Sequence, residues 1–380
     1  MSGSHAYFRP SAPRDSGRTL RTGSYVTDVS NISELPTEER RRLQVVTERY
    51  RFRASEYYLG LVDWTDPHDP LRALILPQEE ELLDFGSLDA SNEASNTVVP
   101  GLQHKYADTA LVLCVEQCGG YCRYCFRKRI FMRGACETTR DLDPVLAYIH
   151  DHAEITDVLL TGGDPLLLST SRLAAILRAL REVPHVRTVR IGTKMPAFNP
   201  YRILDDPELQ DLLAEQSGPG GRIYLMCHFD HPREFTEPAI EAIDLAVRLG
   251  VICANQCPIV AGVNDDPDVL LELFETTTSV GCPQYYLFQG RPTLGNAPFR
   301  VPIVRGWQLF SSARTAASGL ARRARFCMSH ETGKIEIVGV DEHRIYMRYH
   351  RAKDAANHDR LVVCERDDEA VWFDELVPVG

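Results

Sequence analysis

Three closely spaced cysteines are the strongest chemical signal in this chain. Cys118, Cys122 and Cys125 lie in CGGYCRYCFRKR, a glycine-containing loop between an apolar run and a charged one. A cube of four irons and four sulfides takes one protein thiolate per iron. Three thiolates therefore leave one iron free to bind a small chelating molecule. A structural zinc site usually takes four ligands, often in two separated pairs, and this chain has no second CxxC pair. Binding of zinc by the three cysteines, or of no metal, is the alternative.

The spacing C-x3-C-x2-C, with Tyr124 before the last cysteine, is the signature of proteins that cleave S-adenosylmethionine (SAM). The open iron would chelate the amino and carboxylate groups of SAM. An electron from the cluster would then release a 5′-deoxyadenosyl radical, which is chemistry that no side chain performs. Further along, the stretch TGGDP supplies Gly162 and Gly163 for close backbone approach, and Asp164 as an acceptor for an ammonium group. The sequence thus predicts a radical SAM site.

Six short β-rich runs precede these polar residues and indicate how the chain positions them. The runs cover residues 109–115, 157–163, 186–192, 222–228, 251–257 and 284–289. Helix-like segments separate the runs, and several open with Ser, Thr, Asp or Pro, as helix starts prefer. This alternation predicts parallel βαβ units, arranged either as an open doubly wound sheet or as a barrel. In both, functional groups gather at the carboxyl ends of the strands. The residues at these ends are Cys118, Gly162, Gly163, Asp164, Lys194, His228, Asn255, Gln256 and Gln289.

The two ends of the chain differ from this central pattern. Residues 1–30 are rich in Ser, Gly, Pro and Arg, and we expect a disordered tail. Residues 31–104 have apolar residues at helical spacing and predict a helical region. Residues 326–380 alternate like antiparallel strands and predict a small β-rich appendage.

Composition narrows the functional class and the compartment. The net charge of -11 argues against sequence-independent binding of nucleic acid. No apolar run reaches membrane-spanning length, and the N-terminus has no apolar signal core. The 11 cysteines are an odd number, so a secreted disulfide framework is not expected. These features favour a cytoplasmic protein with free thiols that works without nucleic acid or membrane.

From about residue 45 to about 340, the chain resembles the lysine 2,3-aminomutase family of radical SAM enzymes. Six separated segments match in the family's order: YYLGLVDWTDPHDPLRALILPQEEEL, HKYADTALVLCVEQCGGYCRYCFRKR, LLTGGDPLLL, HFDHPREFT, NQCPIVAGVND and YYLFQGRPTLG. The resemblance implies an α/β fold with a partial, six-stranded (β/α)6 TIM-like barrel. That barrel would cover residues 105–325, between the N-terminal helical region and the C-terminal β appendage.

The resemblance also implies roles for particular residues. His228 and Gln256 would contact SAM, and Arg127 would hold the carboxylate of the substrate. Arg127 suits that role because a guanidinium is a preformed fork for carboxylates. Family members also use pyridoxal 5′-phosphate (PLP). Here Lys334 would hold its aldehyde, and Lys105 and Tyr106 would flank its phosphate.

Several positions depart from the family pattern. Thr109 stands where a second phosphate-binding arginine is expected, and the glycine-rich run before the PLP lysine is reduced to Gly333. These changes predict weak PLP binding. Gly290 and Cys327 stand where two aspartates recognise the distal ammonium of lysine. Burying an unpaired ammonium is costly, so lysine itself is not the expected substrate.

The main hypothesis is therefore a radical SAM aminomutase that moves an amino group between C2 and C3 of an amino acid other than lysine. A PLP-independent radical SAM enzyme of another reaction type is the first alternative. The second alternative is a non-catalytic iron–sulfur or metal-binding protein. The expected partners are a small amino-acid substrate and an electron donor such as flavodoxin or ferredoxin. Assembly into a homo-oligomer is compatible with the sequence.

Overall fold

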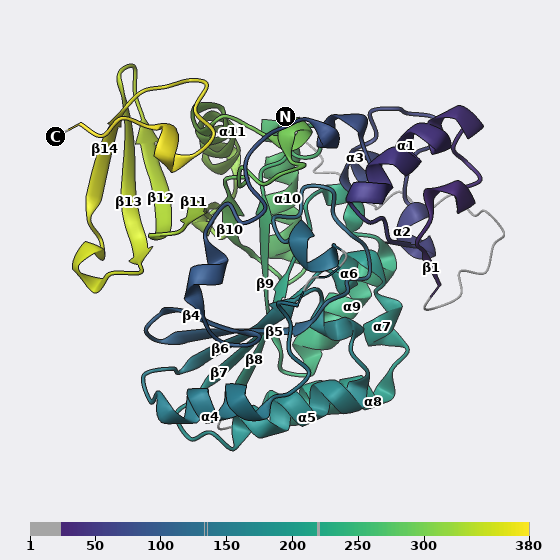
Figure 1. Ribbon diagram of the computed structural model, residues 1–380, viewed down its shortest axis with the longest axis vertical. Helices are drawn as coiled ribbons and strands as arrows, with labels where there is room; N and C mark the ends of the chain where they lie inside the picture. The colour runs from purple at the N-terminus through teal and green to yellow at the C-terminus, as the bar shows by residue number, and fades with distance from the viewer. Residues whose placement is uncertain (1–23, 133, 135, 219–220, 380) are drawn as a thin grey trace, which may run out of the picture.

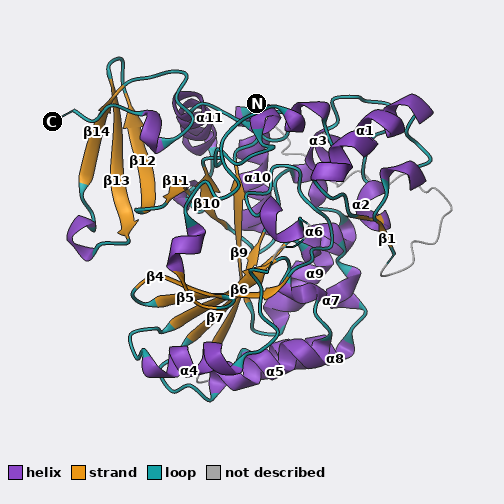
Figure 2. Ribbon diagram, viewed as in Figure 1, coloured by secondary structure: helices purple, strands orange, loops and turns teal. Residues whose placement is uncertain are grey.

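The computed structural model describes residues 24–132, 134, 136–218 and 221–379, which are built around one large mixed sheet (Figures 1 and 2). The strands lie in the order β14-β13-β12-β11-β10-β9-β8-β7-β6-β5-β4-β3, so chain neighbours are also neighbours in the sheet. The strands are β3 (Thr97–Val99), β4 (Leu102–Tyr106), β5 (Thr109–Val115), β6 (Asp157–Gly162), β7 (Thr188–Thr193), β8 (Arg222–Cys227), β9 (Ile252–Pro258), β10 (Gln284–Phe288), β11 (Arg325–His330), β12 (Gly333–Val340), β13 (Arg344–Ala352) and β14 (Leu361–Glu365).

The six predicted strands are present as β5 to β10, and each pairs in parallel with the next. Their strictly sequential order excludes a doubly wound sheet, in which the order reverses at a switch point. Right-handed crossovers between sequential parallel strands place the connecting helices on one face of the sheet. The side chains at the carboxyl ends of the strands can then gather on the uncovered side.

The connecting helices begin where the sequence predicts capping residues. The side chains of Ser169, Asp206, Thr236 and Asp266 each accept a backbone hydrogen bond at the start of a helix. Figure 1 shows α4, α5 and α8 running along one side of the sheet. The helices are α1 (Thr37–Arg49), α2 (Glu56–Leu59), α3 (Pro70–Ile75), α4 (Asp143–Asp151), α5 (Thr170–Arg181), α6 (Met195–Phe198), α7 (Tyr201–Leu204), α8 (Pro207–Gln216), α9 (Glu237–Arg248), α10 (Pro267–Ser279) and α11 (Ile303–Ala316).

The C-terminal strands continue the main sheet. Strand β11 pairs in parallel with β10, with Phe288 opposite Cys327, and is a seventh parallel strand beyond the six expected. Strands β12, β13 and β14 then add in antiparallel fashion. The sequence did not signal β11 because RFCMSH is short and leads directly into β12, without the helix that marks a βα unit. The β-rich C-terminus is thus joined to the parallel strands through backbone hydrogen bonds.

The N-terminal region packs over the loop that carries the three cysteines. An apolar core joins Tyr58, Leu71 and Leu74 to Tyr124 and Phe198. The tail expected from the sequence covers residues 1–30. Its first 23 residues lie outside the described part of the chain. After them, Tyr25–Val26 forms β1, which pairs with β2 (Ala54–Ser55). None of the helices in the described ranges is long and apolar enough to cross a membrane.

Candidate active site

A cavity of about 410 Å³ lies at the carboxyl ends of the parallel strands. It is lined by residues from the cysteine loop, from the ends of β6, β7 and β9, and from β4, β10 and β12. All the site residues predicted from the sequence line this one cavity: Lys105, Tyr106, Cys118, Cys122, Cys125, Arg127, Gly162, Gly163, Asp164, His228, Gln256 and Lys334. The fold therefore brings together positions that span more than half of the chain.

The two glycines at the end of β6 are required by close backbone packing. Gly162 has a φ of +112°, and a Cβ on Gly163 would lie 2.0 Å from the carbonyl oxygen of Gln117. The amides of Gly163 and Asp164 donate to the carbonyls of Val115 and Gln117 at 2.6 and 2.8 Å. The two glycines allow the end of β6 to pack closely against the start of the cysteine loop. This contact fixes the point at which the loop leaves β5. Their predicted contact with SAM stays a prediction.

Asp164 is buried beside the glycines, and its carboxylate accepts hydrogen bonds from three groups. These are the Leu166 amide at 3.0 Å, the Thr193 hydroxyl at 2.9 Å and the Lys194 amide at 2.7 Å. Burial raises the pKa of Asp164 to about 6, against the opposing effect of these hydrogen bonds. In this structure Asp164 ties the end of β6 to the end of β7. Its predicted bond to an ammonium group is untested.

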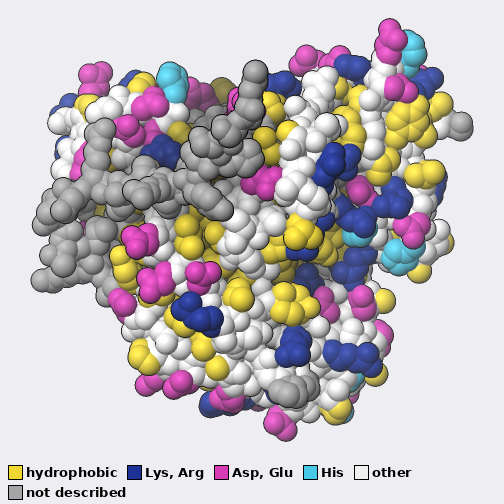
Figure 3. All heavy atoms as spheres, turned by 180° about the vertical axis from the view of Figure 1, so that it is seen from behind, with side chains coloured by type: hydrophobic (Ala, Val, Ile, Leu, Met, Phe, Trp, Pro, Cys, Tyr) yellow, Lys and Arg dark blue, Asp and Glu magenta, His cyan; other side chains and the backbone are white. Residues whose placement is uncertain are grey.

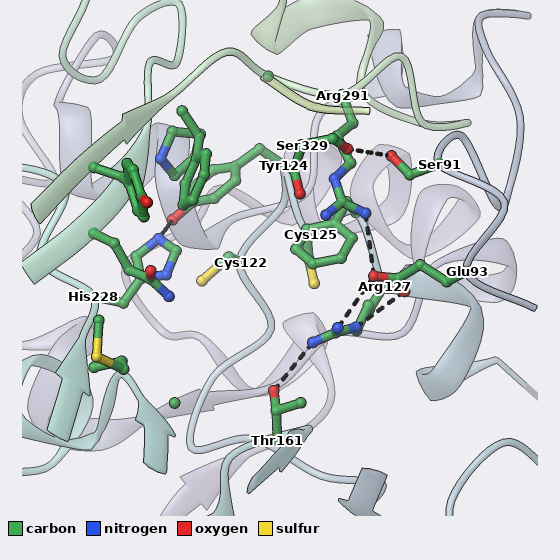
Figure 4. Close-up of a pocket in the computed structure, with 18 of the residues that line it drawn as sticks. Ser91, Glu93, Cys122, Tyr124, Cys125, Arg127, Thr161, His228, Arg291 and Ser329 are labelled. Atoms are coloured by element: carbon green, nitrogen blue, oxygen red, sulfur yellow. Dashed lines mark hydrogen bonds and ion pairs between the residues drawn. The ribbon is translucent and has the colours of Figure 1, made fainter. Parts of the chain in front are cut away.

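The three cysteines are free thiols on the wall of the cavity. Apolar side chains, including Leu113, Tyr121 and Phe131, pack around Cys118 and Cys125, and Figure 4 shows the sulfurs of Cys122 and Cys125 in the cavity region. Burial raises the pKa of all three thiols, so their thiolates need a bound cation. Among the described residues, no three His, Cys, Asp or Glu side chains converge to hold a single metal ion. A cluster needs no such convergence, because each thiolate binds a different iron.

A buried ion group anchors the cysteine loop to the N-terminal region. Arg123, between Cys122 and Cys125, is 2% exposed and forms a bidentate pair with Glu81 at 2.9 and 2.8 Å. Lys128, three residues after Cys125, donates to the same carboxylate at 3.1 Å and to the carbonyl of Gly295 at 2.6 Å. Glu81 is fully buried. This role could not be predicted from the sequence, because Glu81 lies in the acidic run QEEEL, which is typical of an exposed surface.

A second buried ion group positions His228. Its Nε2 lies 2.9 Å from the Tyr124 hydroxyl, as Figure 4 shows, and 3.2 Å from Asp230. The Tyr124 hydroxyl in turn donates to Asp230 at 2.6 Å. Lys194 donates to Asp230 and Glu234, both at 2.6 Å, and to the carbonyl of His228 at 2.8 Å. Tyr124, which lies between Cys122 and Cys125, therefore helps to hold His228, a residue predicted to contact SAM, in position.

Arg127 belongs to a group of three guanidiniums around one buried carboxylate. Glu93 accepts from Arg127 at 3.2 and 3.1 Å and from Arg291 at 3.2 Å (Figure 4). It also accepts from Arg129 at 2.8 Å. Arg127 also donates to the Thr161 hydroxyl at 3.1 Å. Burial alone would raise the pKa of Glu93, but the guanidiniums outweigh it and hold this pKa well below its usual range. Arg129 also pairs with Glu137 and Asp89, whereas Glu93 is the one carboxylate that pairs with Arg127 and Arg291 among the described residues, which leaves these two guanidiniums capacity for a second carboxylate.

Lys105, Tyr106 and Lys334 lie together on the side of the cavity formed by β4 and β12. The Nζ of Lys334 lies 4.6 Å from the ring centre of Phe288 and 5.0 Å from that of Tyr286. Among the described residues it has no hydrogen-bond or ion-pair partner. Burial lowers the pKa of Lys334 to about 8 and, aided by nearby cations, that of Lys105 to about 7. Lys334 is thus a buried, unengaged amine, as attachment of an aldehyde requires.

Basic residues outnumber acidic ones in the cavity lining, although three of them are ion-paired with carboxylates outside the lining: Lys194 with Asp230 and Glu234, Arg190 with Asp157, and Arg351 with Asp108. The only acidic residues among its described lining are Glu93 and Asp164, and both are already hydrogen-bonded. Its basic residues are Lys105, Arg127, Arg190, Lys194, Arg291, Arg300, Lys334 and Arg351. Figure 3 shows Lys, Arg and His side chains gathering on the side of the molecule that carries the C-terminal strands. Such a cavity favours ligands with several negative charges.

Comparison with known proteins shows the class of enzyme and the family to which the chain belongs. Residues 107–199 match a family profile described as a 4Fe-4S single cluster domain, and this range contains all three cavity cysteines. A protein of Aquifex aeolicus (strain VF5), provisionally named L-lysine 2,3-aminomutase, is 50% identical over 352 residues, covering 92% of this chain and 94% of that protein. L-lysine 2,3-aminomutase of Acetoanaerobium sticklandii is 34% identical over 297 residues, covering 77% and 70%. Glutamate 2,3-aminomutase of Clostridioides difficile (strain 630) is 32% identical over 301 residues, covering 78% and 70%.

These similarities, together with the three-cysteine loop, define an iron–sulfur enzyme of the radical SAM class. The chain belongs to the lysine 2,3-aminomutase family of radical SAM isomerases. The resemblance inferred from the six sequence segments is thereby confirmed. A four-iron cluster and SAM are the cofactors that this family and the cluster domain support.

Proposed function

We propose that this protein is a PLP-dependent 2,3-aminomutase for an α-amino acid whose side chain does not end in an ammonium group. The observation that carries the proposal is the charge of the cavity: Lys105, Arg300 and Lys334 line it without an ion-pair partner in the described structure, and the two acids of its described lining, Glu93 and Asp164, are already engaged. When bound, the cluster and SAM supply the radical, and PLP holds the migrating amino group. The residues of the chain bind the substrate and disfavour a side chain that ends in a positive charge.

Arg127 and Arg291 are the residues proposed to bind the substrate carboxylate. Both guanidiniums line the cavity, and both already contact Glu93. Because these two guanidiniums share one carboxylate, an incoming carboxylate can bind without displacing it. Arg127 is also held by the Thr161 hydroxyl at the end of β6, close to the glycine turn. We therefore expect the substrate carboxylate to bind between the cysteine loop and β6.

The distal end of the substrate decides which amino acid fits. Gly290 lines the cavity without offering a charge, and Cys327 is a fully buried thiol whose pKa burial raises to about 12. A lysine ammonium would therefore be buried without a carboxylate partner, at a cost of several kcal/mol. An acidic or neutral side chain has no such cost, and the similar protein of C. difficile is named for glutamate.

The surroundings of Lys334 support PLP as the cofactor. Lys334 and its neighbours Lys105 and Tyr106 line one wall of the cavity, and the Tyr106 hydroxyl is buried with no hydrogen-bond partner in the described structure. Tyr286 and Phe288 provide apolar surface next to the lysine. An amine with a lowered pKa, next to aromatic rings and cationic groups, fits an aldehyde that carries a phosphate.

Trapping experiments test this assignment. Borohydride reduction after incubation with PLP is expected to give a phosphopyridoxyl adduct that maps to Lys334 by peptide mass spectrometry. Because only the neutral amine attacks an aldehyde, and burial lowers the Lys334 pKa to about 8, the trapping rate should rise with pH through about 8. An ordinary lysine would show that rise near 10.4. The adduct should be absent in Lys334→Ala.

Lys353 provides the matched control. It follows the same strand pair, and its amine donates to Asn96 at 2.8 Å. Lys353→Ala should trap PLP at Lys334 as the wild type does. If saturating PLP gives no adduct at Lys334 while SAM is still cleaved, the first alternative, a PLP-independent radical SAM enzyme, replaces this proposal.

The remaining parts of the assignment follow from the same family. The sequential parallel strands and the open ends of the sheet at β3 and β14 support a partial barrel of the TIM type. We assign the barrel to residues 105–325, the helical region to 31–104 and the β-rich appendage to 326–380. An external electron donor of the flavodoxin or ferredoxin type would reduce the cluster in the cytoplasm. The substrate is a small molecule, and the enzyme works apart from nucleic acid and membrane.

A further inference from the structure

A group of cations at the border of the cavity and the C-terminal strands lacks a matching anion. Lys334 on β12 and Arg351 on β13 are direct cross-strand partners. Like charges directly opposite each other in an antiparallel pair are destabilising. The strands also approach closely here, because a Cβ on Gly333 would lie 2.3 Å from the carbonyl oxygen of Arg351. The fold therefore places two cationic side chains on the same face of neighbouring strands.

Further cations surround this pair. Lys105 on β4 lies 5.4 Å from the ring centre of Tyr106, and its amine donates to the carbonyl of His330. The charges of Arg291 and Lys334, which both line the cavity, lower the pKa of Lys105, although burial is the largest cause. The anions that pair with these cations are Glu93, which three guanidiniums share, and Asp108, which is largely exposed. The group has room for a dianion.

Arg351 is held in place on the wall of this group. Its guanidinium lies 4.3 Å from the ring centre of Tyr106 and donates to the Thr109 hydroxyl at 2.8 Å. It also forms an ion pair with Asp108, the residue before Thr109. Arg351 and Tyr106 both line the cavity, and the buried Tyr106 hydroxyl has no partner in the described structure. A guanidinium, an ammonium and a phenol thus meet at the start of β5.

We propose that Arg351 binds the phosphate group of PLP and so replaces the charge that is missing at Thr109. This inference rests on the proposed function, because it assumes that PLP is the cofactor held at Lys334. Thr109 does not leave a gap: its hydroxyl accepts a hydrogen bond that orients the guanidinium from β13. The C-terminal strands then provide the aldehyde-binding lysine and a phosphate-binding arginine from opposite positions of one strand pair.

The test compares PLP with pyridoxal, which has the same aldehyde and ring but no phosphate. Arg351→Gln should weaken PLP binding by about 10- to 100-fold and change pyridoxal binding by less than about twofold. Arg351→Lys keeps the charge and should retain most of the preference for PLP. Inorganic phosphate should compete with PLP in the wild type and compete poorly in Arg351→Gln. Equilibrium dialysis and PLP absorbance give the affinities, and circular dichroism confirms folding.

Arg344→Gln is the matched control. Arg344 lies on the same strand, outside the cavity lining, and pairs with Glu365 at 3.5 Å. This variant should bind both aldehydes as the wild type does. The proposal is overturned if Arg351→Gln leaves PLP affinity unchanged, or if it weakens PLP and pyridoxal equally.

SAM cleavage and Lys334 trapping in the same samples distinguish this failure from failure of the proposed function. Wild-type protein that traps PLP at Lys334 but does not respond to Arg351→Gln overturns the Arg351 assignment alone. If the wild-type protein cleaves SAM but binds PLP no better than pyridoxal, the proposed phosphate-binding site is wrong. If it also gives no adduct at Lys334, PLP dependence fails as well, and radical activity stands.

Discussion

Replacing any one of Cys118, Cys122 and Cys125 with alanine is expected to abolish the four-iron cluster. Each thiolate holds one iron, and the fourth iron has no protein ligand in this arrangement, so a single loss leaves two irons without one. Protein purified without oxygen should be brown and contain close to one four-iron cluster per chain. Iron and sulfide analysis of each variant, together with its absorbance spectrum, measures the loss. Reductive cleavage of SAM should disappear with the cluster.

Two other cysteines provide matched controls for this experiment. Cys114 and Cys253 are free and buried in the main apolar core, on β5 and β9. Cys114→Ala and Cys253→Ala should keep the full iron content, although each removes a buried thiol. A full cluster in all three variants of the loop cysteines would contradict the assignment.

Glu81→Ala is expected to lower the free energy of unfolding by about 3–5 kcal/mol, because it leaves buried cations without their carboxylate. Arg123 cannot lose its proton and would be buried unpaired. Lys128 can respond partly, because burial already lowers its pKa to about 8. Since these two cations hold the loop on both sides of Cys125, the variant should also load less iron. Anaerobic urea unfolding, followed by circular dichroism, measures the stability.

Glu79 tests whether burial, and not acidity alone, makes Glu81 important. Glu79 lies two residues earlier, with its side chain 54% exposed, and pairs with the exposed Arg42 at 3.5 Å. Glu79→Ala should change the stability by less than about 1 kcal/mol, as is usual for exposed ion pairs. Equal effects of the two substitutions would show that the buried group does not anchor the loop.

The sequence allowed prediction of features that depend on local patterns. The parallel strands were found because apolar runs, capping residues and glycines recur with the period of βαβ units, and β5 spans the predicted residues 109–115. The cysteine spacing is likewise local. All twelve predicted site residues line the cavity. The residues that follow the parallel strands meet there because the carboxyl ends of these strands lie at one edge of the sheet, whereas Lys105, Tyr106 and Lys334 reach the cavity from the antiparallel strands β4 and β12.

The part of the site that was not predicted depends on contacts between residues that lie far apart in the chain. Glu93 lies in an unremarkable polar stretch, yet it meets Arg127 and, almost 200 residues later, Arg291. Glu234 lies 40 residues after Lys194, and Arg351 lies more than 240 residues after Thr109. Sequence periodicity cannot pair such residues, because the pairing depends on how the sheet and its loops fold together. The departure from the family pattern at Thr109 can be read from the sequence, whereas the hydrogen bond from Arg351 to Thr109 can be seen only in the structure.

Product analysis with labelled amino acids tests the central claim most directly. The reconstituted enzyme, with SAM, PLP and a reductant, would be given L-glutamate, L-alanine or L-lysine, each carrying deuterium at C3. We predict that an acidic or neutral amino acid yields the corresponding β-amino acid and transfers deuterium into SAM or 5′-deoxyadenosine, while L-lysine yields little product. Fast, saturable conversion of L-lysine to β-lysine, with no turnover of the others, would contradict this account of the cavity.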